Sequence, residues 1–160
     1  SGSDFSIITA RSNPPQAIKD GIKLIIKREL SYGETKEMEE NLNGVTIDEY
    51  LNLQDYHPVS STEFAEKFGL ESVGTNPEEG KMIAFEDFVD RVVDKVSSYQ
   101  DTDDFEGISI GFSDDDISNV EVVEKLIEDK LRQKYPEIRF LVYDTSDPNN
   151  PKKKRIIIKK

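Results

Sequence analysis

Apolar residues gather in short runs along the chain, separated by polar and turn-forming segments. Three of these runs have the length and composition of buried strands. They are Phe5–Ile8, Gly107–Ser113 and Ile138–Tyr143. A fourth run, Arg155–Ile158, predicts a last strand that either forms a hairpin with the third or fills another gap in the sheet.

The segments between these runs carry apolar residues at helical spacing. Ile18, Ile22, Ile25 and Ile26 predict a helix that carries these residues on one face. Asn76-Pro77 is a typical helix start, and the apolar stripe from Ile83 to Val96 predicts a long helix packed on the core. Asn119–Lys134 predicts another amphipathic helix. Strands that alternate with helices in this way favour a layered α/β fold.

The segment between the first and second of these helices is less regular. Ser31–Gly44 is polar and acidic, which predicts a surface excursion with a short helix. Val45–Val59 fits either a short helix or a strand. Ser60–Glu63 has the spacing of a helix capping box, and Gly69 is expected to end the helix that follows.

Composition narrows the classes of protein that fit. A chain of 160 residues suits a single domain over residues 1–160. The net charge of -12 argues against a nucleic-acid-binding surface over the whole protein, although a basic segment lies near the C-terminus. With no cysteine, disulfides and thiolate catalysis are excluded. No apolar run reaches the ~20 residues of a membrane span, and we expect a cytoplasmic protein without membrane partners.

Polar side chains follow two of the predicted strands. Thr9 and Arg11 follow the first strand, and Asp114–Asp116 follow the second, with Asn119 shortly after them. In open parallel sheets, ligands bind at the carboxyl ends of the strands. The two groups are therefore the first candidates for a functional site, and we expect Thr9 and Asp114 at the same edge of one mostly parallel sheet.

These residues resemble motifs of the haloacid dehalogenase (HAD) superfamily. Ile7–Arg11 is similar to its second motif, whose Thr or Ser binds the transferred phosphoryl group. Lys81 matches the lysine of the third motif, which steadies the charge of the phosphate and the nucleophile. Gly111–Asn119 looks like the fourth motif, whose acids hold magnesium. The three motifs occur in the family order.

The resemblance implies a Rossmann-like three-layer sandwich with a mostly parallel sheet. It assigns catalytic roles to Thr9 and Lys81, phosphate binding to Thr9, Arg11 and Lys81, and Mg²⁺ to Asp114 and Asp115. Magnesium needs only one or two protein carboxylates beside phosphate and water, so adjacent acids meet that need. Residues 31–74 lie where such proteins carry a small cap or insertion.

The family's first motif, a hydrophobic strand followed by Asp-x-Asp, is missing from the chain. It supplies the nucleophile and the acid/base partner, so an aspartyl-phosphate mechanism needs it. Asp144–Asp147 is the nearest imitation, with different spacing and after the fourth motif. The motif's strand is also central in the family sheet, and either Arg155–Ile158 or a partner chain is expected to fill that gap.

Two functional hypotheses follow. In the first, the chain is a HAD-like phosphatase or phosphotransfer domain that acts on a phosphorylated small molecule or a nucleic-acid end, with the nucleophile upstream of Ser1. In the second, it is a non-catalytic binding or assembly module within a larger complex, such as a viral particle, with a protein partner. His57, the one histidine, is interpreted as structural, because no triad or histidine metal site accompanies it.

Each candidate residue also has a purely structural interpretation. Thr9 can simply end a strand, and Arg11 can pair with a local acid. Asp114–Asp116 can cap the next helix, and Lys81 can be a solvated helix residue.

Overall fold

The chain forms a mixed α/β structure of two compact units. The computed structural model describes residues 4–71, 76–97 and 107–156, with side chains described as far as Lys152. One unit spans Ser1–Pro77 and the other spans Glu78–Lys160. Within these described residues each unit holds one pair of parallel strands, which confirms the α/β class. The single domain predicted over residues 1–160 stays a prediction.

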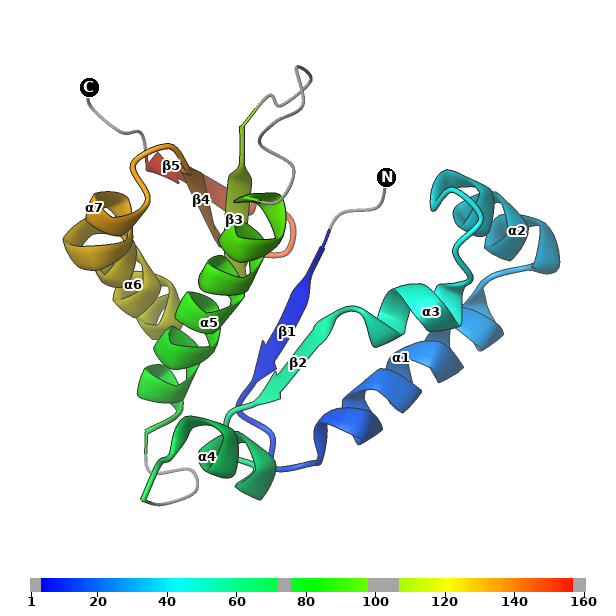
Figure 1. Ribbon diagram of the computed structural model, residues 1–160, viewed down its shortest axis with the longest axis horizontal. Helices are drawn as coiled ribbons and strands as arrows, with labels where there is room; N and C mark the ends of the chain where they lie inside the picture. Colours follow the sequence, from blue (N-terminus) through cyan, green and yellow to red (C-terminus); the bar gives the residue numbers. More distant parts are fainter. Residues whose placement is uncertain (1–3, 72–75, 98–106, 157–160) are drawn as a thin grey trace. The chain divides into compact units, whose positions relative to one another are not determined.

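The first unit is built on the parallel pair of β1 (Ser6–Thr9) and β2 (Asp55–Pro58), which lie side by side in Figure 1. Parallel strands need a long connection, which helices supply here. The connection consists of α1 (Pro15–Glu29), α2 (Tyr32–Asn41) and α3 (Ile47–Asn52), and α4 (Thr62–Phe68) follows β2.

Side-chain caps fix where these helices begin and end. Ser31 with Glu34 begins α2, and Thr46 with Glu49 begins α3, each as a reciprocal capping box. Ser61 caps α4, and Gly69 ends it in the left-handed conformation at φ 64°. A glycine adopts that conformation without steric cost, so the predicted end of this helix is confirmed.

The structure refines two predictions for this unit. Val45–Val59, predicted to be either a helix or a strand, contains both, since α3 and β2 lie within it. The helix predicted from Ile18 to Ile26 is present as α1, but none of its residues is buried and Ile25 is 61% exposed. The apolar spacing is therefore that of a helix with one partly covered face.

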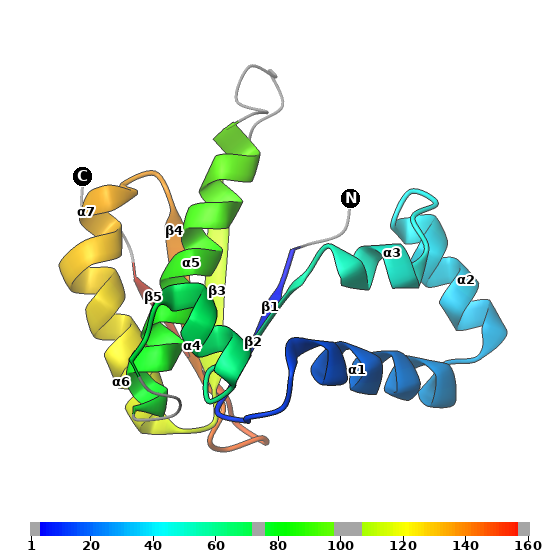
Figure 2. The ribbon, with the colours of Figure 1, turned by 60° about the horizontal axis from the view of Figure 1, so that its bottom comes forward.

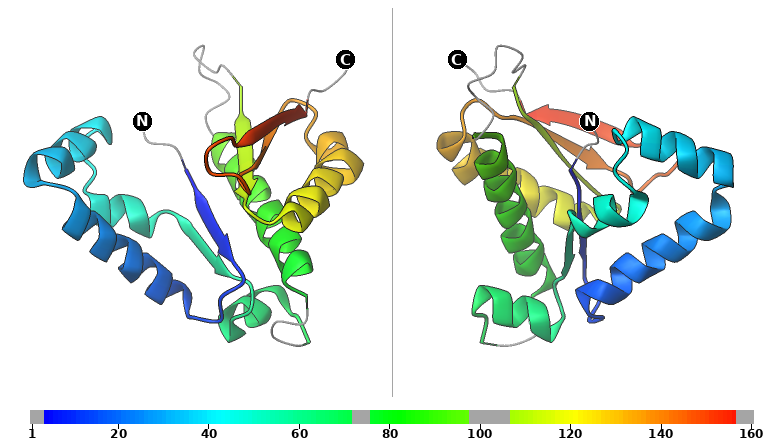
Figure 3. Two further views of the ribbon diagram at one scale, coloured as in Figure 1. Left: turned by 180° about the vertical axis from the view of Figure 1, so that it is seen from behind. Right: turned by 45° about the vertical axis from the view of Figure 1, so that its right-hand side comes forward.

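The second unit begins with α5 (Pro77–Ser97), which confirms the helix predicted from Asn76-Pro77. It contains β3 (Ser109–Asp114), then α6 (Ile117–Leu126), which continues through the π-helical turn η1 (Ile127–Leu131) into α7 (Arg132–Lys134). The chain then forms β4 (Arg139–Asp144) and β5 (Lys152–Ile156). β3 and β4 run parallel, and β5 pairs with β4 as an antiparallel hairpin (Figure 3).

One face of this second sheet packs on helices. Ile110 and Phe112 of β3 are buried, and they lie opposite Phe140 and Val142 of β4, which are also buried. The ring of Phe85 on α5 meets the ring of Phe112 edge-on, with 5.4 Å between centroids. Figure 2 shows α5 and α6 running along this sheet. The apolar stripe of α5 is thus core, as predicted.

The described strands form two sheets where the sequence predicted one. β1 pairs with β2, and β3 pairs with β4, but no described strand joins these two pairs. The described part of the last strand, as far as Ile156, lies on the far side of β4, so the hairpin alternative is confirmed and this part fills no central gap. Among the described helices, none has both the length and the apolar content to cross a bilayer.

Candidate functional site

Asp114, a predicted metal ligand, is the last residue of β3. It therefore lies at the carboxyl end of the parallel β3–β4 pair, where its register partner on β4 is Asp144. Carboxyl ends of parallel strands are where α/β proteins bind their ligands. The second sheet thus presents two aspartates at the edge where a ligand site is expected.

Lys81 of α5 reaches the Asp114 side chain. Its Nζ donates to Asp114 Oδ2 at 2.7 Å, and both side chains are only 10% exposed. The two residues lie 33 positions apart in the sequence, and both belong to the second unit. The predicted third-motif lysine and fourth-motif aspartate are therefore in direct contact, and the interpretation of Lys81 as a solvated residue is wrong.

The other oxygen of Asp114 binds the start of α6. Asp114 Oδ1 accepts the main-chain N–H of Asp116 at 3.0 Å and the Nδ2 group of Asn119 at 3.1 Å. Asp116 in turn caps α6 by accepting the N–H of Ser118 at 2.9 Å. Asp114 and Asp116 therefore have different roles. Asp116 caps α6, and Asp114 connects the end of β3 to α5 and to the start of α6.

These contacts decide the charge of Asp114. Burial raises the pKa of its carboxyl group, but hydrogen bonds from Lys81, from Asp116 and from Asn119 outweigh burial and hold the pKa below the ordinary value. The carboxylate is therefore charged over the whole neutral range, and it is paired with the ammonium of Lys81. We name Lys81, Asp114 and Asn119 the Asp114 network.

Little of Asp114 remains for a metal ion. An ionised carboxylate offers about four lone-pair positions. Three are taken by the donors of Lys81, Asp116 and Asn119. Asp115 is exposed next to it and offers a second carboxylate. The pair meets the minimum donor set of a hydrated Mg²⁺ ion, but not a closed protein site.

The remaining predicted site residues, Thr9 and Arg11, belong to the first unit. Thr9 ends β1, and its carbonyl accepts the N–H of Val59 at 2.8 Å, which extends the pairing with β2. Arg11 is exposed in the turn that follows. Their participation in one phosphate site with Lys81 stays a prediction.

The position of Asp144 beside Asp114 was not predicted from the sequence. It ends β4 in register with Asp114, although its spacing does not match the family's first motif. Its Oδ1 accepts the N–H and the hydroxyl of Ser146 at 3.0 and 2.6 Å, and these hydrogen bonds lower the pKa of Asp144. The sequence shows only that Asp144 follows an apolar run. Acidic residues follow many strands at turns, so this pattern does not identify a site residue.

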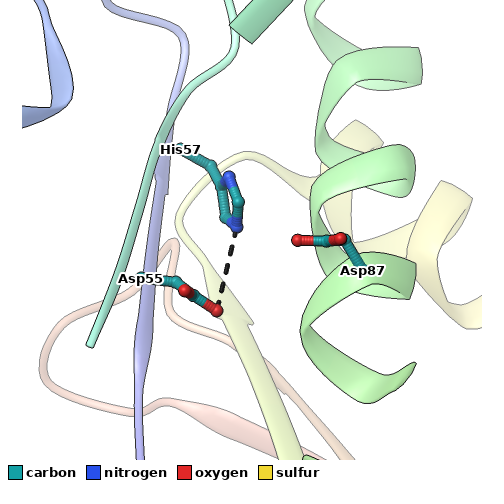
Figure 4. A group of neighbouring side chains, drawn as sticks. All are labelled: Asp55, His57 and Asp87. Atoms are coloured by element: carbon teal, nitrogen blue, oxygen red, sulfur yellow. Dashed lines mark ion pairs between the residues drawn. The ribbon is translucent and has the colours of Figure 1, made fainter. Parts of the chain in front are cut away.

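His57 lies in the apolar part of the first unit. Its side chain is 4% exposed, and its ring packs against those of Phe64 and Phe68. The Nε2 atom of His57 lies 4.0 Å from Oδ2 of Asp55, and Figure 4 shows the two side chains facing each other. Asp87, which is also drawn there, belongs to α5 in the second unit. The aromatic packing supports the structural interpretation of His57.

A pocket lies in the first unit. It has a volume of about 690 Å³ and is lined by residues of α1, α2 and α3 and the connections between them. Lys23 of α1 and Asp48 of α3 form an ion pair at 3.0 Å, and both residues line the pocket. Part of its wall comes from residues 31–74, the segment predicted to be a cap or insertion, whose role stays a prediction.

Replacing Lys81 should destabilise the protein more than replacing an exposed lysine. Lys81→Met leaves a buried carboxylate without its cation, and we expect a loss of about 3 kcal/mol in the free energy of unfolding at neutral pH. The matched control is Lys130→Met, since Lys130 is 56% exposed in its ion pair with Glu86. That loss should stay below about 1 kcal/mol. Denaturant unfolding measures both, and equal losses would contradict the assigned strength of the Asp114 network.

The comparisons add no relative to this picture. The chain matches no protein-family model, no curated protein and no solved structure. The HAD resemblance therefore rests on the motif residues themselves, and the family and its activity remain proposals.

Proposed function

We propose that the chain is a HAD-like phosphatase or phosphotransfer domain that is incomplete or inactive alone. The proposal includes the family's Rossmann-like three-layer sandwich for the complete protein. One observation carries it, the contact between Lys81 and Asp114 at the carboxyl end of β3. An ammonium and a carboxylate held at a strand end, with little exposure, are the parts that a phosphoryl-transfer site needs.

The chemistry of Lys81 supports phosphate binding. An ammonium group has three N–H donors, and the contact with Asp114 uses one of them. The other two would donate to phosphoryl oxygens, on which negative charge develops during transfer. Asp114 fixes the ammonium in place, so that Lys81 loses little freedom when a phosphate binds.

The proposed metal site contains few protein ligands. Asp114 has about one lone-pair position left, and the exposed Asp115 supplies a second carboxylate, so the two would hold a largely hydrated Mg²⁺ ion. When bound, the ion would neutralise charge on the phosphoryl oxygens. The protein's own groups would orient the phosphate through Lys81 and Thr9.

The nucleophile has to come from elsewhere. Asp114 cannot attack phosphorus, because its oxygens are engaged by Lys81, Asp116 and Asn119. Covalent phosphoryl transfer needs a carboxylate in line with phosphorus, and the family's Asp-x-Asp motif is missing. Asp144 is the nearest substitute, given its register with Asp114. We propose that the working enzyme obtains the nucleophile from a segment upstream of Ser1.

The second hypothesis, a non-catalytic binding or assembly module, has its own support. The carboxylate of Asp114 is bound by three donors from the protein itself, as in a purely structural network. In that case Lys81 would serve only the fold. Phosphate binding separates the two hypotheses.

Magnesium should bind weakly, and phosphate should strengthen its binding. With one free position on Asp114, calorimetric titration should saturate only near millimolar Mg²⁺, an interaction of ~4 kcal/mol. Inorganic phosphate should tighten binding if Lys81 holds it beside the metal, and Lys81→Met should remove that effect.

Two double variants that each remove two negative charges test the metal site. Asp114→Asn with Asp115→Asn should abolish the heat of magnesium binding. Glu121→Gln with Asp129→Asn removes two exposed acids from the same unit and should leave it unchanged. Magnesium binding that phosphate does not affect would favour the non-catalytic module.

The isolated chain should hydrolyse a generic phosphate ester no faster than the variant with Thr9→Ala and Lys81→Ala. These two residues would lower a transition state by a few kcal/mol, about 10²-fold to 10³-fold in rate, but they assist a covalent step that the chain cannot start. A colorimetric phosphate-release assay with Mg²⁺ measures this. Magnesium-dependent turnover that the double variant loses would mean that the chain holds its own nucleophile, with Asp144 and Asp116 the first residues to replace.

A further inference from the structure

The pocket of the first unit has the size of a small-molecule site. Its volume of about 690 Å³ falls within the ~300–1,000 Å³ that is typical of such sites. Every residue that lines it belongs to the first unit, so the pocket is formed within one unit. Ile26, Leu30 and Ile47 supply an apolar part of the lining, and charged side chains of α1, α2 and α3 supply much of the rest. The pocket therefore combines an apolar surface with charged groups.

A row of lysines on α1 supplies the positive charge. The Nζ of Lys19 donates to Asn52 Oδ1 at 3.0 Å, and the Nζ of Lys23 lies 3.0 Å from Asp48 Oδ1, so both side chains bind residues of α3. Residues four positions apart lie on the same face of a helix, so Lys27 continues this row. In the described part of the chain, however, the ammonium of Lys27 has no ion pair or hydrogen bond. It is an exposed, unpaired cation that lines the pocket.

Glu39 of α2 supplies a negative charge to the same pocket. Its Oε1 accepts the main-chain N–H of Ile47 at 3.2 Å, which holds the carboxylate against the start of α3. Its Oε2 accepts no hydrogen bond from the residues that the structure describes. One oxygen of Glu39 is thus fixed by the protein, and the other is left for a donor from outside.

The balance of charge indicates what kind of ligand fits. The ion pair between Lys23 and Asp48 leaves one positive and one negative group without a partner, on Lys27 and Glu39. A ligand with a single charge would satisfy one of these groups and be repelled by the other. A zwitterion satisfies both, with its anionic group at Lys27 and its cationic group at Glu39.

The apolar part of the pocket indicates the rest of the ligand. Tyr32 lines the pocket at the first turn of α2, and its side chain is 86% exposed. Ile26 and Leu30 of α1 lie four positions apart and share one face of the helix. An aromatic ring that packed on these two residues and on Tyr32 would remove apolar surface from water, and ring pairs add to that gain.

We propose that the pocket between α1, α2 and α3 binds a free aromatic amino acid. The ligand's carboxylate accepts a hydrogen bond from Lys27, and its ammonium donates to Oε2 of Glu39. Its ring packs on the apolar part of the pocket beside Tyr32. This site is independent of the phosphate chemistry at the Asp114 network.

An NMR titration of the backbone amides with L-phenylalanine tests the proposal on the full chain. We expect saturable binding with a Kd below ~1 mM, and the largest shifts at the residues that line the pocket. Phenylpropionate keeps the ring and the carboxylate but lacks the ammonium, and phenethylamine keeps the ring and the ammonium but lacks the carboxylate. Each should bind at least ~10-fold more weakly, because one charged group of the pocket stays unpaired.

Two variants assign the charged groups. Lys27→Met should weaken phenylalanine binding at least ~10-fold. Glu39→Gln should do the same, although glutamine keeps an oxygen for the N–H of Ile47. The matched controls are Lys125→Met and Glu121→Gln, which replace exposed residues of α6 in the second unit and should leave binding unchanged.

Three results would overturn the proposal. The first is the lack of saturation up to ~10 mM phenylalanine, which would mean that the pocket is no site for this class of ligand. The second is equal binding of phenylpropionate or phenethylamine, because apolar packing would then account for binding without the charged pair. The third is an effect of Lys27→Met and Glu39→Gln no larger than that of the controls. The comparison of the three ligands needs no variant, so it stands even where a variant fails to fold.

Discussion

The carboxylate of Asp114 joins three elements of the second unit. It ends β3, it accepts a hydrogen bond from Lys81 of α5, and it accepts two more at the start of α6 from Asp116 and Asn119. A charge with so little exposure is costly unless it is paired and fully hydrogen-bonded. The positions of α5 and α6 at this end of β3 are therefore constrained by the need to satisfy one side chain.

The same contacts are the basis of the proposed phosphate chemistry. A structural role alone could be filled by apolar residues of similar volume, often without loss of stability. An ion pair at the carboxyl end of a strand offers in addition an oriented ammonium and part of a carboxylate. The three hydrogen bonds that Asp114 accepts also limit the site. They leave its carboxylate unable to act as a nucleophile and with about one position for a metal ion.

The sequence predicted local features better than long-range ones. Asn76-Pro77 and Gly69 carry their own backbone preferences, so the start of α5 and the end of α4 could be read directly. The placement of Lys81 near Asp114 came from the family resemblance, because a contact over 33 positions leaves no local signal. The exposure of Ile25 was missed because helical spacing shows which residues share a face, not what covers it.

The division of the strands into two sheets was missed for a related reason. Apolar runs identify β1 and β3 as strands. They do not show which other strand each one pairs with, and in the structure β1 pairs with β2 and β3 with β4. The sequence left two places open for the run Arg155–Ile158. Its described part, as far as Ile156, pairs with β4, because the turn-rich segment before it makes a hairpin the short connection.

The most direct test of the Asp114 network is an NMR titration of the Asp114 side-chain carboxyl carbon. The account predicts a pKa below the ordinary 3.8 in the unmodified protein. It predicts a higher pKa in Lys81→Met, because burial then opposes the charged form without the ammonium to offset it. A pKa at or above the ordinary value in the unmodified protein, or the same pKa in both proteins, would contradict the account.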